Sequence, residues 1–322
     1  MVRLVSADAR GIGKPATVEH SEWLQRRLAV FNHRRLVPAL PGAGWRAELR
    51  EETGLRDLEG KYLERERETI APLLAELPLI ADAFMSWFER LRETGPGQND
   101  ALFPWLAGQA SMAEMRWFLT QEVAGEAGFE DLVAMTQLRF PTRAKLELAR
   151  NYWDEMGRGH EDGMHGPMLT ATAVELKLDP TVDGTVCEAL ALANMMVALA
   201  ANRRYAYQAI GALGVIEMTA PGRVAMVNTG LRRLGVTARG RRYFQLHAGL
   251  DIKHSEAWNA EVIRPLAESD PAIAHAIAEG ALLRLRCGAR CFERYRQELG
   301  FTAEAAPRRR LVARFSRAGR AA

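Results

Sequence analysis

The sequence predicts an all-α fold, and three observations support this prediction. Long stretches rich in Ala, Leu, Arg and Glu repeat their apolar residues with the period of an α-helix. The alternating β-branched runs that are typical of strands are scarce. Hydrophobic residues make up 48% of the 322-residue chain, which is enough to bury a sizeable core. We therefore expect helices packed around one large core or two smaller ones.

Clusters of Gly and Pro divide the helical stretches, because these residues favour turns. The clusters are LPGAGW near residue 42, ETGPGQND at 93–100, RFPTR near 141, DPTVDGT near 183, MTAPGR near 221 and GVTARGR near 235. The apolar period between them predicts helices over about 21–38, 53–93, 110–138, 142–156, 161–177, 185–217, 221–234, 240–266 and 270–299.

The chain divides into three parts, because the residues of chemical interest all follow residue 100. We expect an N-terminal helical extension over 1–100 that packs on the core, a main domain over 101–302 and a basic C-terminal tail over 303–322. Much of the net charge of +3 lies in this tail, from Pro307 onward. The tail is expected to be a solvated chain end, so nucleic acid is not an expected partner.

The sequence shows neither a membrane span nor a secretory signal. No run of eighteen apolar residues occurs, and the opening MVRLVSADARGIGK lacks an apolar core. We expect a cytoplasmic protein without a membrane partner. Cys187, Cys287 and Cys291 are too few and too irregular for a disulfide framework, so we expect them to be small buried side chains.

His247, Asp251 and His254 stand at positions i, i+4 and i+7 of one predicted helix. At about 100° per residue they occupy an arc of roughly 60° on one helix face. Two imidazoles and a carboxylate aimed at one point are ligands for iron, manganese or zinc. A solvated polar stripe is the alternative, but apolar neighbours such as Phe244 and Leu250 place the trio within the domain. Burying such groups without a partner would cost several kcal/mol each, and a metal offsets that cost.

A second element joins Glu155 to His165, ten positions later. A continuous helix would separate the two residues by about 15 Å, which is too far for one site. Gly157 and Gly159 lie between them and can reverse the chain. Asp162 lies closer to His165 and competes with Glu155 for the role of ligand.

Two further carboxylates lie in helical stretches with few charges. Glu217 ends an uncharged run, where a lone buried carboxylate is unfavourable, although a solvent-facing position at a helix end is the alternative. Glu122 has Glu126 and Glu130 as rivals at helical spacing. Carboxylates and histidines from several helices are typical of di-iron carboxylate bundles. The ferritin-like version needs two Glu-x-x-His pairs, and this sequence contains none.

The ordered set of these residues resembles the haem-oxygenase-like di-iron oxidases and oxygenases, which are seven-helix proteins that bind two non-haem iron ions instead of haem. The resemblance covers about residues 105–300. It rests on Gln121-Glu122, on NYWDEMGRG with Glu155 followed by His165, on the ALGVIE run that ends in Glu217, and on His247-x3-Asp251-x2-His254 thirty residues later.

The resemblance implies an O2-dependent oxidoreductase with two Fe ions as cofactor, in which reduced iron activates O2 through a bridging peroxide. Residues that match ligands in much of the family are Glu122, His165, Glu217, Asp251 and His254. Glu155 and His247 match additional ligands of the amine N-oxygenase branch. We therefore expect N-oxygenation of an amine or an amino-acid-derived substrate in biosynthesis. Other branches cleave, decarboxylate or desaturate fatty acids or amino acids, so these reactions stay open.

Two departures from the family pattern and three alternative readings accompany this resemblance. The N-terminal extension is unmatched, and Asp162 stays open as a replacement for Glu155. A cofactorless or haem-binding relative would leave most of the ordered ligands unused. A non-enzymatic helical module that binds nucleic acid through the basic tail would show salt-sensitive binding and no O2 consumption.

The expected partners are O2, a small-molecule substrate, an external electron donor and a second copy of the chain in a homodimer. A substrate carboxylate could be bound by arginines, and the candidates are Arg143, Arg150 and Arg242. Side chains that could orient the ligands are Tyr243, Gln245 and Trp153.

Overall fold

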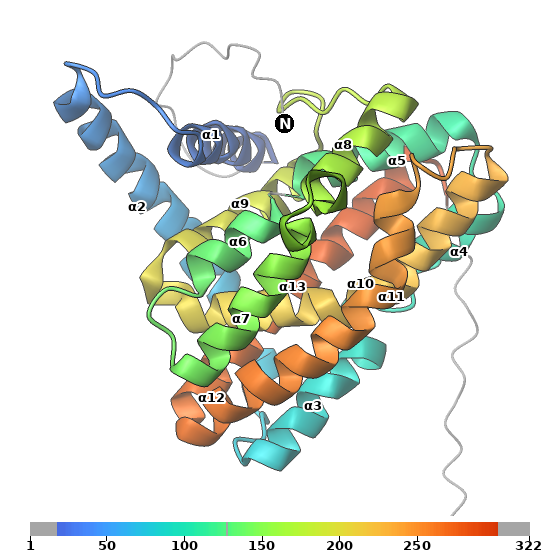
Figure 1. Ribbon diagram of the computed structural model, residues 1–322. Coiled ribbons are helices and arrows are strands. Elements are labelled where there is room, and N and C mark those ends of the chain that lie inside the picture. Colours follow the sequence, from blue (N-terminus) through green and yellow to red (C-terminus); the bar gives the residue numbers. More distant parts are fainter. Residues whose placement is uncertain (1–17, 127, 302–322) are drawn as a thin grey trace, which may run out of the picture.

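The computed structural model describes residues 18–126 and 128–301, and within these ranges every regular element is a helix (Figure 1). The prediction of an all-α fold is therefore confirmed. In chain order the elements are α1 (Val18–Leu36), α2 (Trp45–Ile70), η1 (Ala71–Leu74), α3 (Ala81–Thr94), α4 (Leu102–Gly108), α5 (Met112–Gly125), α6 (Phe129–Thr136), α7 (Thr142–Glu155), η2 (Gly157–Gly159), η3 (Glu161–Gly163), α8 (His165–Leu176), α9 (Cys187–Ala201), η4 (Arg203–Tyr205), α10 (Ala206–Arg233), α11 (Arg242–Trp258), the π-helical turn η5 (Asn259–Ile263), α12 (Arg264–Ser269) and α13 (Pro271–Glu298).

Helix α10 is the centre of the bundle and packs against both α11 and α13. Glycines allow α10 and α13 to approach closely. A Cβ atom on Gly211 would lie 1.8 Å from the carbonyl oxygen of Ile277, and one on Gly280 would lie 1.8 Å from that of Gln208. Because no side chain fits at either position, the two backbones are in direct contact.

Helix α10 is also long and apolar enough to cross a membrane by length and composition, within the span Arg203–Arg233. In this structure 56% of its apolar stretch is buried against other helices. The core helix of a folded domain has the same composition.

Three predicted helices are interrupted where the backbone requires it. The helix predicted over 53–93 is α2, η1 and α3, with a break over 75–80 that contains Pro78. The helix predicted over 110–138 stops after α5, because Gly128 adopts φ 72° before α6 begins. Asn202, at φ −103° and ψ 114°, ends α9 within the helix predicted over 185–217.

The predicted break at Pro221 is wrong, because α10 continues through this residue to Arg233. Proline removes one backbone hydrogen bond from a helix interior. Packing of α10 against α11 and α13 along its length keeps the helix continuous despite this loss.

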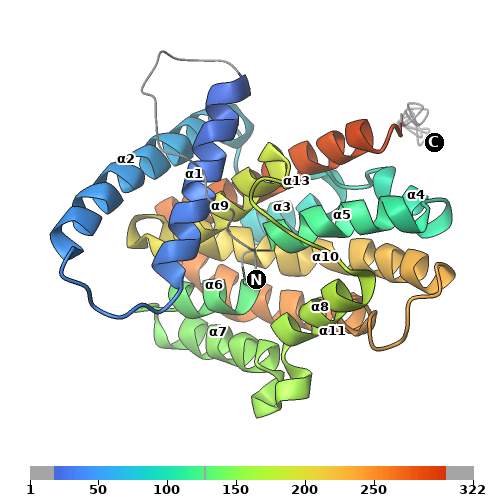
Figure 2. The ribbon, with the colours of Figure 1, turned by 90° about the horizontal axis from the view of Figure 1, so that it is seen from above.

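Helices α1 and α2 lie at one side of the bundle, at the left in both views (Figures 1 and 2). Buried polar side chains join α1 to α9: Asn32 donates to Asn194 Oδ1 at 2.8 Å, and Asn194 donates to Gln25 Oε1 at 2.9 Å. The hydroxyl of Tyr62 on α2 donates to the carbonyl oxygen of Ala191 at 3.0 Å. The boundary near residue 100 stays a prediction, and the basic tail over 303–322 lies outside the described residues.

Candidate metal centre

Four helices bring six of the predicted ligands into the interior. These residues are between 2% and 8% exposed, and they are Glu155 at the end of α7, His165 at the start of α8, Glu217 on α10, and His247, Asp251 and His254 on α11. The three residues of α11 share a buried face, as their spacing requires.

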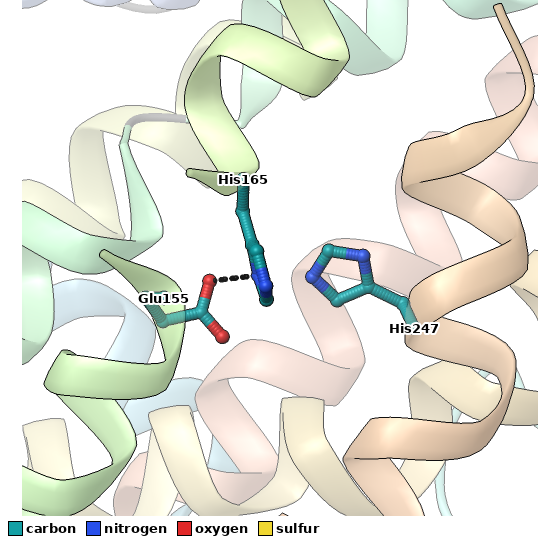
Figure 3. A group of neighbouring side chains, drawn as sticks. All are labelled: Glu155, His165 and His247. Atoms are coloured by element: carbon teal, nitrogen blue, oxygen red, sulfur yellow. Dashed lines mark ion pairs between the residues drawn. The ribbon is translucent and has the colours of Figure 1, made fainter. Parts of the chain in front are cut away.

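A tight reversal of the chain joins Glu155 to His165, as the glycines predicted. Gly157, Arg158 and Gly159 all have positive φ, at 60°, 55° and 84°. An antiparallel bridge between residues 156 and 164 closes the turn. As a result, Nδ1 of His165 lies 2.5 Å from Oε2 of Glu155 (Figure 3).

The donor atoms form two groups, each with all atoms within 4.8 Å of one another. One group is Glu155, His165 and His247, whose side chains point toward a common centre in Figure 3. The other is Glu155, Glu217 and His254. Glu155 belongs to both groups, so a carboxylate in this position can bridge two cations.

Hydrogen bonds fix which nitrogen of two histidines is free. The Nδ1–H of His247 donates to the carbonyl oxygen of Tyr243 at 2.8 Å, because a carbonyl can only accept. Nε2 of this imidazole therefore has a free lone pair. On His254 the Nε2–H donates to Oδ2 of Asp154 at 3.2 Å, and Nδ1 lies 3.5 Å from Oε2 of Glu217. A histidine held in this way at one nitrogen presents the other to a metal.

The carboxylates of this cluster cannot all be charged without cations. Burial, together with the charge of Glu217, raises the pKa of Glu155 to about 9. The same causes and the charge of Glu155 raise the pKa of Asp251 to about 9. Without metal ions, the carboxyl groups of Glu155 and Asp251 are therefore protonated at neutral pH.

The pKa values of the three histidines are shifted in opposite directions. Burial and a neighbouring imidazole lower the pKa of His165 and of His247 to about 4. Burial opposes the charged form of His254 too, but Glu217 and Asp154 outweigh it and raise its pKa to about 9. Two of the three imidazoles are thus neutral at pH 7, which is the form that binds metal.

Three buried donor atoms have no hydrogen-bond partner among the described residues. They are Oδ1 of Asp251 and two imidazole nitrogens that face a carboxylate without forming a hydrogen bond, namely Nδ1 of His165 beside Glu155 and Nδ1 of His254 beside Glu217. Buried polar atoms without partners are unfavourable, and a cation at the cluster would satisfy all three. A mixed set of imidazole and carboxylate donors suits iron among the transition metals. The residues present therefore fit the cofactor that the sequence implies.

Glu122 lies in the same cavity but outside both groups. Burial raises the pKa of this carboxyl, and Tyr295, Arg284 and Arg223 oppose the shift. Burial raises the pKa of Glu126 to about 8, and the charges of Glu130 and Glu155 contribute. The charge of Glu130 also acts on Glu155. The role of Glu122 as a ligand stays a prediction, and its two rivals lie within electrostatic reach of the cluster.

Two residues that support the cluster were not predicted. Nδ2 of Asn151 donates to Oε1 of Glu217 at 2.6 Å, and Asp154 binds His254 and also accepts from Arg158 at 2.6 Å. Both lie in the stretch NYWDE before Glu155, where the helical position of Asn151 could have indicated that it faces the site.

Several predicted supporting side chains point elsewhere. Gln245 is exposed, and Trp153 is 53% exposed and packs near Gly159. Tyr243 contributes through its carbonyl oxygen, and its ring lies 4.2 Å from that of His247. Asp162, the rival of Glu155, is exposed.

The predicted arginine contacts to a substrate lie at the surface. Arg143 forms an ion pair with Glu261, with its side chain 59% exposed, and the side chain of Arg150 is 64% exposed. Arg242 is exposed as well. None of these three lines the cavity beside the cluster.

Comparison with known proteins gives the family. A family model described as an iron-containing redox enzyme matches residues 116–289, which is more than half of the chain. No curated protein matches the sequence. The matched range contains every predicted ligand from Glu122 to His254. The chain therefore belongs to the iron-containing redox enzymes, a family of oxidoreductases, and has their haem-oxygenase-like all-α fold.

Proposed function

We propose that this oxidoreductase is a non-haem di-iron oxygenase that uses O2 to N-oxygenate a small amine or an amino-acid-derived substrate. The observation that carries this proposal is the pair of donor groups that share Glu155. Two cation positions joined by one carboxylate are typical of di-iron sites. A haem needs a single axial histidine, and would leave the other buried donors without a partner.

The composition of the first donor group supports N-oxygenation. His247 and Glu155 match the ligand positions that distinguish the amine N-oxygenase branch, and both lie in one group with His165. Asp162 is exposed, so Glu155 is the better candidate for the additional carboxylate.

The protein's part in the reaction is to hold the donors and to control protons. Bound iron would supply the electrons that reduce O2. Asn151 orients Glu217 through its amide, and Asp154 keeps His254 in the tautomer that leaves Nδ1 free. The carbonyl oxygen of Tyr243 accepts a hydrogen bond from Nδ1 of His247 and so leaves the lone pair of Nε2 free. Preorganised donors of this kind need no rearrangement when the cations bind.

The cavity beside the cluster limits the size of the substrate. It has a volume of about 180 Å³ and is lined at the cluster by Glu155, Glu217, His247 and Asp251. Elsewhere its lining is mostly apolar, with the charged side chains of Glu122, Glu126, Arg223 and Arg284. An engineered cavity of about 150 Å³ holds benzene, so this cavity suits a compound slightly larger than benzene.

A separate groove of about 960 Å³ connects the surface to the cluster. Its walls come from α1, α8 and α9, and it reaches His165 and Glu155. His33 and Leu36 of α1 belong to one wall, so the N-terminal helix takes part in access to the site.

The test is turnover of iron-loaded enzyme with a reductant, a panel of small amines and amino acids, and ¹⁸O2. We expect a product that carries one labelled oxygen on nitrogen, detected by mass spectrometry. Glu155→Gln should abolish this product, and Asp162→Asn, which changes an exposed carboxylate, should leave it unchanged. Labelled carbonyl fragments or released CO2 in place of an N-oxygenated product would contradict N-oxygenation.

A further inference from the structure

The cavity beside the candidate metal centre has an acidic end and a basic end. Glu155 and Glu217, which belong to the cluster, form the acidic end, and Arg223 and Arg284, which line the same cavity, form the basic end. Glu217 and Arg223 are six positions apart on α10, which corresponds to about 9 Å along the helix axis. Arg284 reaches the cavity from α13. The two arginines are therefore within reach of a small molecule that also touches the cluster.

Arg223 is surrounded by neutral groups. Its guanidinium donates to Oγ1 of Thr219 at 3.2 Å and to Oε1 of Gln98 at 3.5 Å. It also lies over two aromatic rings, 5.6 Å from the centroid of Phe292 and 5.9 Å from that of Phe103. Burial and the charge of Arg284 lower the pKa of Arg223 to about 10, so it remains charged at pH 7.

Arg284 makes no hydrogen bond or ion pair with any described residue, and its Nε is buried without a partner. Glu122 is the carboxylate whose charge acts on both arginines, but neither guanidinium approaches it within the 4.0 Å of an ion pair. Tyr295 also acts on this carboxylate and lowers its pKa. Two half-buried cations thus face at most one anion, and none if Glu122 binds iron.

We propose that Arg223 and Arg284 form a subsite for a carboxylate group of the substrate. A planar carboxylate accepts two parallel hydrogen bonds from a guanidinium and would neutralise the excess charge. The position of the other end of the substrate rests on the proposed function, which places the amine nitrogen at the cluster. The substrate class is then a small amino acid or aminocarboxylate, held at both ends of a cavity of about 180 Å³.

The arginines of this subsite are not the ones that the sequence suggested. Arg143, Arg150 and Arg242 are exposed, whereas Arg223 and Arg284 line the cavity. Arg242 is therefore a matched control, since it carries the same charge on the element that bears three candidate ligands.

The test is calorimetric binding of benzoate and of its neutral analogue benzamide to the full-length protein, both iron-free and loaded with Fe²⁺ without O2. We expect wild-type protein to bind benzoate at least about tenfold more tightly than benzamide. Arg223→Met and Arg284→Met should each weaken benzoate binding at least about tenfold. Lysine at either position should restore part of it, and Arg242→Met should have no effect.

Three results would overturn the subsite: no benzoate binding by wild-type protein, equal binding of benzoate and benzamide, or unchanged affinity in both methionine variants. Circular dichroism shows whether each variant is folded. If a methionine variant does not fold, the lysine variant and the wild-type comparison with benzamide still decide. Iron stoichiometry is measured on the same samples. Selective benzoate binding without iron binding would retain the subsite and reject the proposed function, and the reverse result would reject the subsite alone.

Discussion

The histidines of the candidate metal centre are each oriented by a different kind of partner. A backbone carbonyl holds His247, and a carboxylate, Asp154, holds His254. Because Asp154 also binds Arg158 at 2.6 Å, its pKa is lowered despite partial burial, and it stays ionised at neutral pH. When a cation displaces the second proton of His254, an ionised acceptor keeps the remaining proton on Nε2 and leaves the lone pair of Nδ1 directed at the cluster.

At the scale of single residues, we predict that Asp154→Ala weakens iron binding. Loss of the acceptor lets the imidazole of His254 rotate and change tautomer, which lowers metal affinity by about 10–100-fold. Competition with a chelator measures the change. Asp162→Ala removes an exposed carboxylate from the same loop region and should leave the affinity as it is. Equal affinities of the two variants would show that Asp154 does not position His254.

A second prediction concerns the free energy of unfolding at the basic end of the cavity. Arg284 is a half-buried cation whose buried Nε has no partner and which makes no ion pair among the described residues, so Arg284→Met should stabilise the ligand-free protein. We expect the melting temperature to rise by about 2 °C or more. Arg242→Met, at the surface, should leave it unchanged. A fall in melting temperature for Arg284→Met would mean that its charge is compensated in the ligand-free state.

Among the elements, the turn between α7 and α8 does most to assemble the site. Gly157 has φ 60°, and a Cβ atom there would lie 2.3 Å from the carbonyl carbon of Gly163. Only glycine fits both the backbone angle and the space. The turn therefore determines that Glu155 and His165 meet.

We predict that Gly157→Ala destabilises this turn and lowers iron affinity. The left-handed backbone costs about 1–2 kcal/mol for alanine, and the steric clash adds to it. Gly235→Ala is the control, because Gly235 also has positive φ, at 81°, but has no neighbouring atom within 4 Å. Thermal unfolding and chelator competition measure both effects. If the two variants lost stability equally and kept iron affinity, the space around Gly157 would be irrelevant.

The sequence could predict this turn and the shared face of His247, Asp251 and His254, because both follow from local geometry. It could not predict that α10 continues through Pro221, since that depends on packing against α11 and α13. Arg223 and Arg284 were missed for the same reason. They lie on different helices, and nothing in the local sequence distinguishes them from surface arginines.

At the scale of the whole molecule, the candidate metal centre makes the free energy of unfolding depend on pH when iron is absent. Glu155, Asp251 and His254 all have folded pKa values of about 9, above their ordinary values. The protons on these three groups favour the folded state. This contribution falls as pH rises from the unfolded pKa values, about 4 for the two carboxyls and about 6.5 for His254, to about 9. His165 and His247 have lowered pKa values of about 4, so their contribution rises with pH only up to about 6.5 and is constant above it.

We accordingly predict that the melting temperature of the iron-free protein falls between pH 7 and pH 9. Iron-loaded protein should not show this fall, because bound cations keep the carboxylates ionised in the folded state. Iron-free Asp251→Asn should show a shallower fall, since one of the titrating groups is gone. Calorimetric scans in the two states make the comparison, and identical slopes with and without iron would count against a metal site at this cluster.

We propose that one chain binds two iron ions through donor groups that share Glu155. Anaerobic titration of the iron-free chain with Fe²⁺, followed by Mössbauer spectroscopy, tests this proposal most directly. We predict saturation at about two iron ions per chain for wild-type protein and for Asp162→Asn, and loss of at least one iron ion in Glu155→Gln. Saturation at one iron ion or none in wild-type protein, or unchanged stoichiometry in Glu155→Gln, would contradict it.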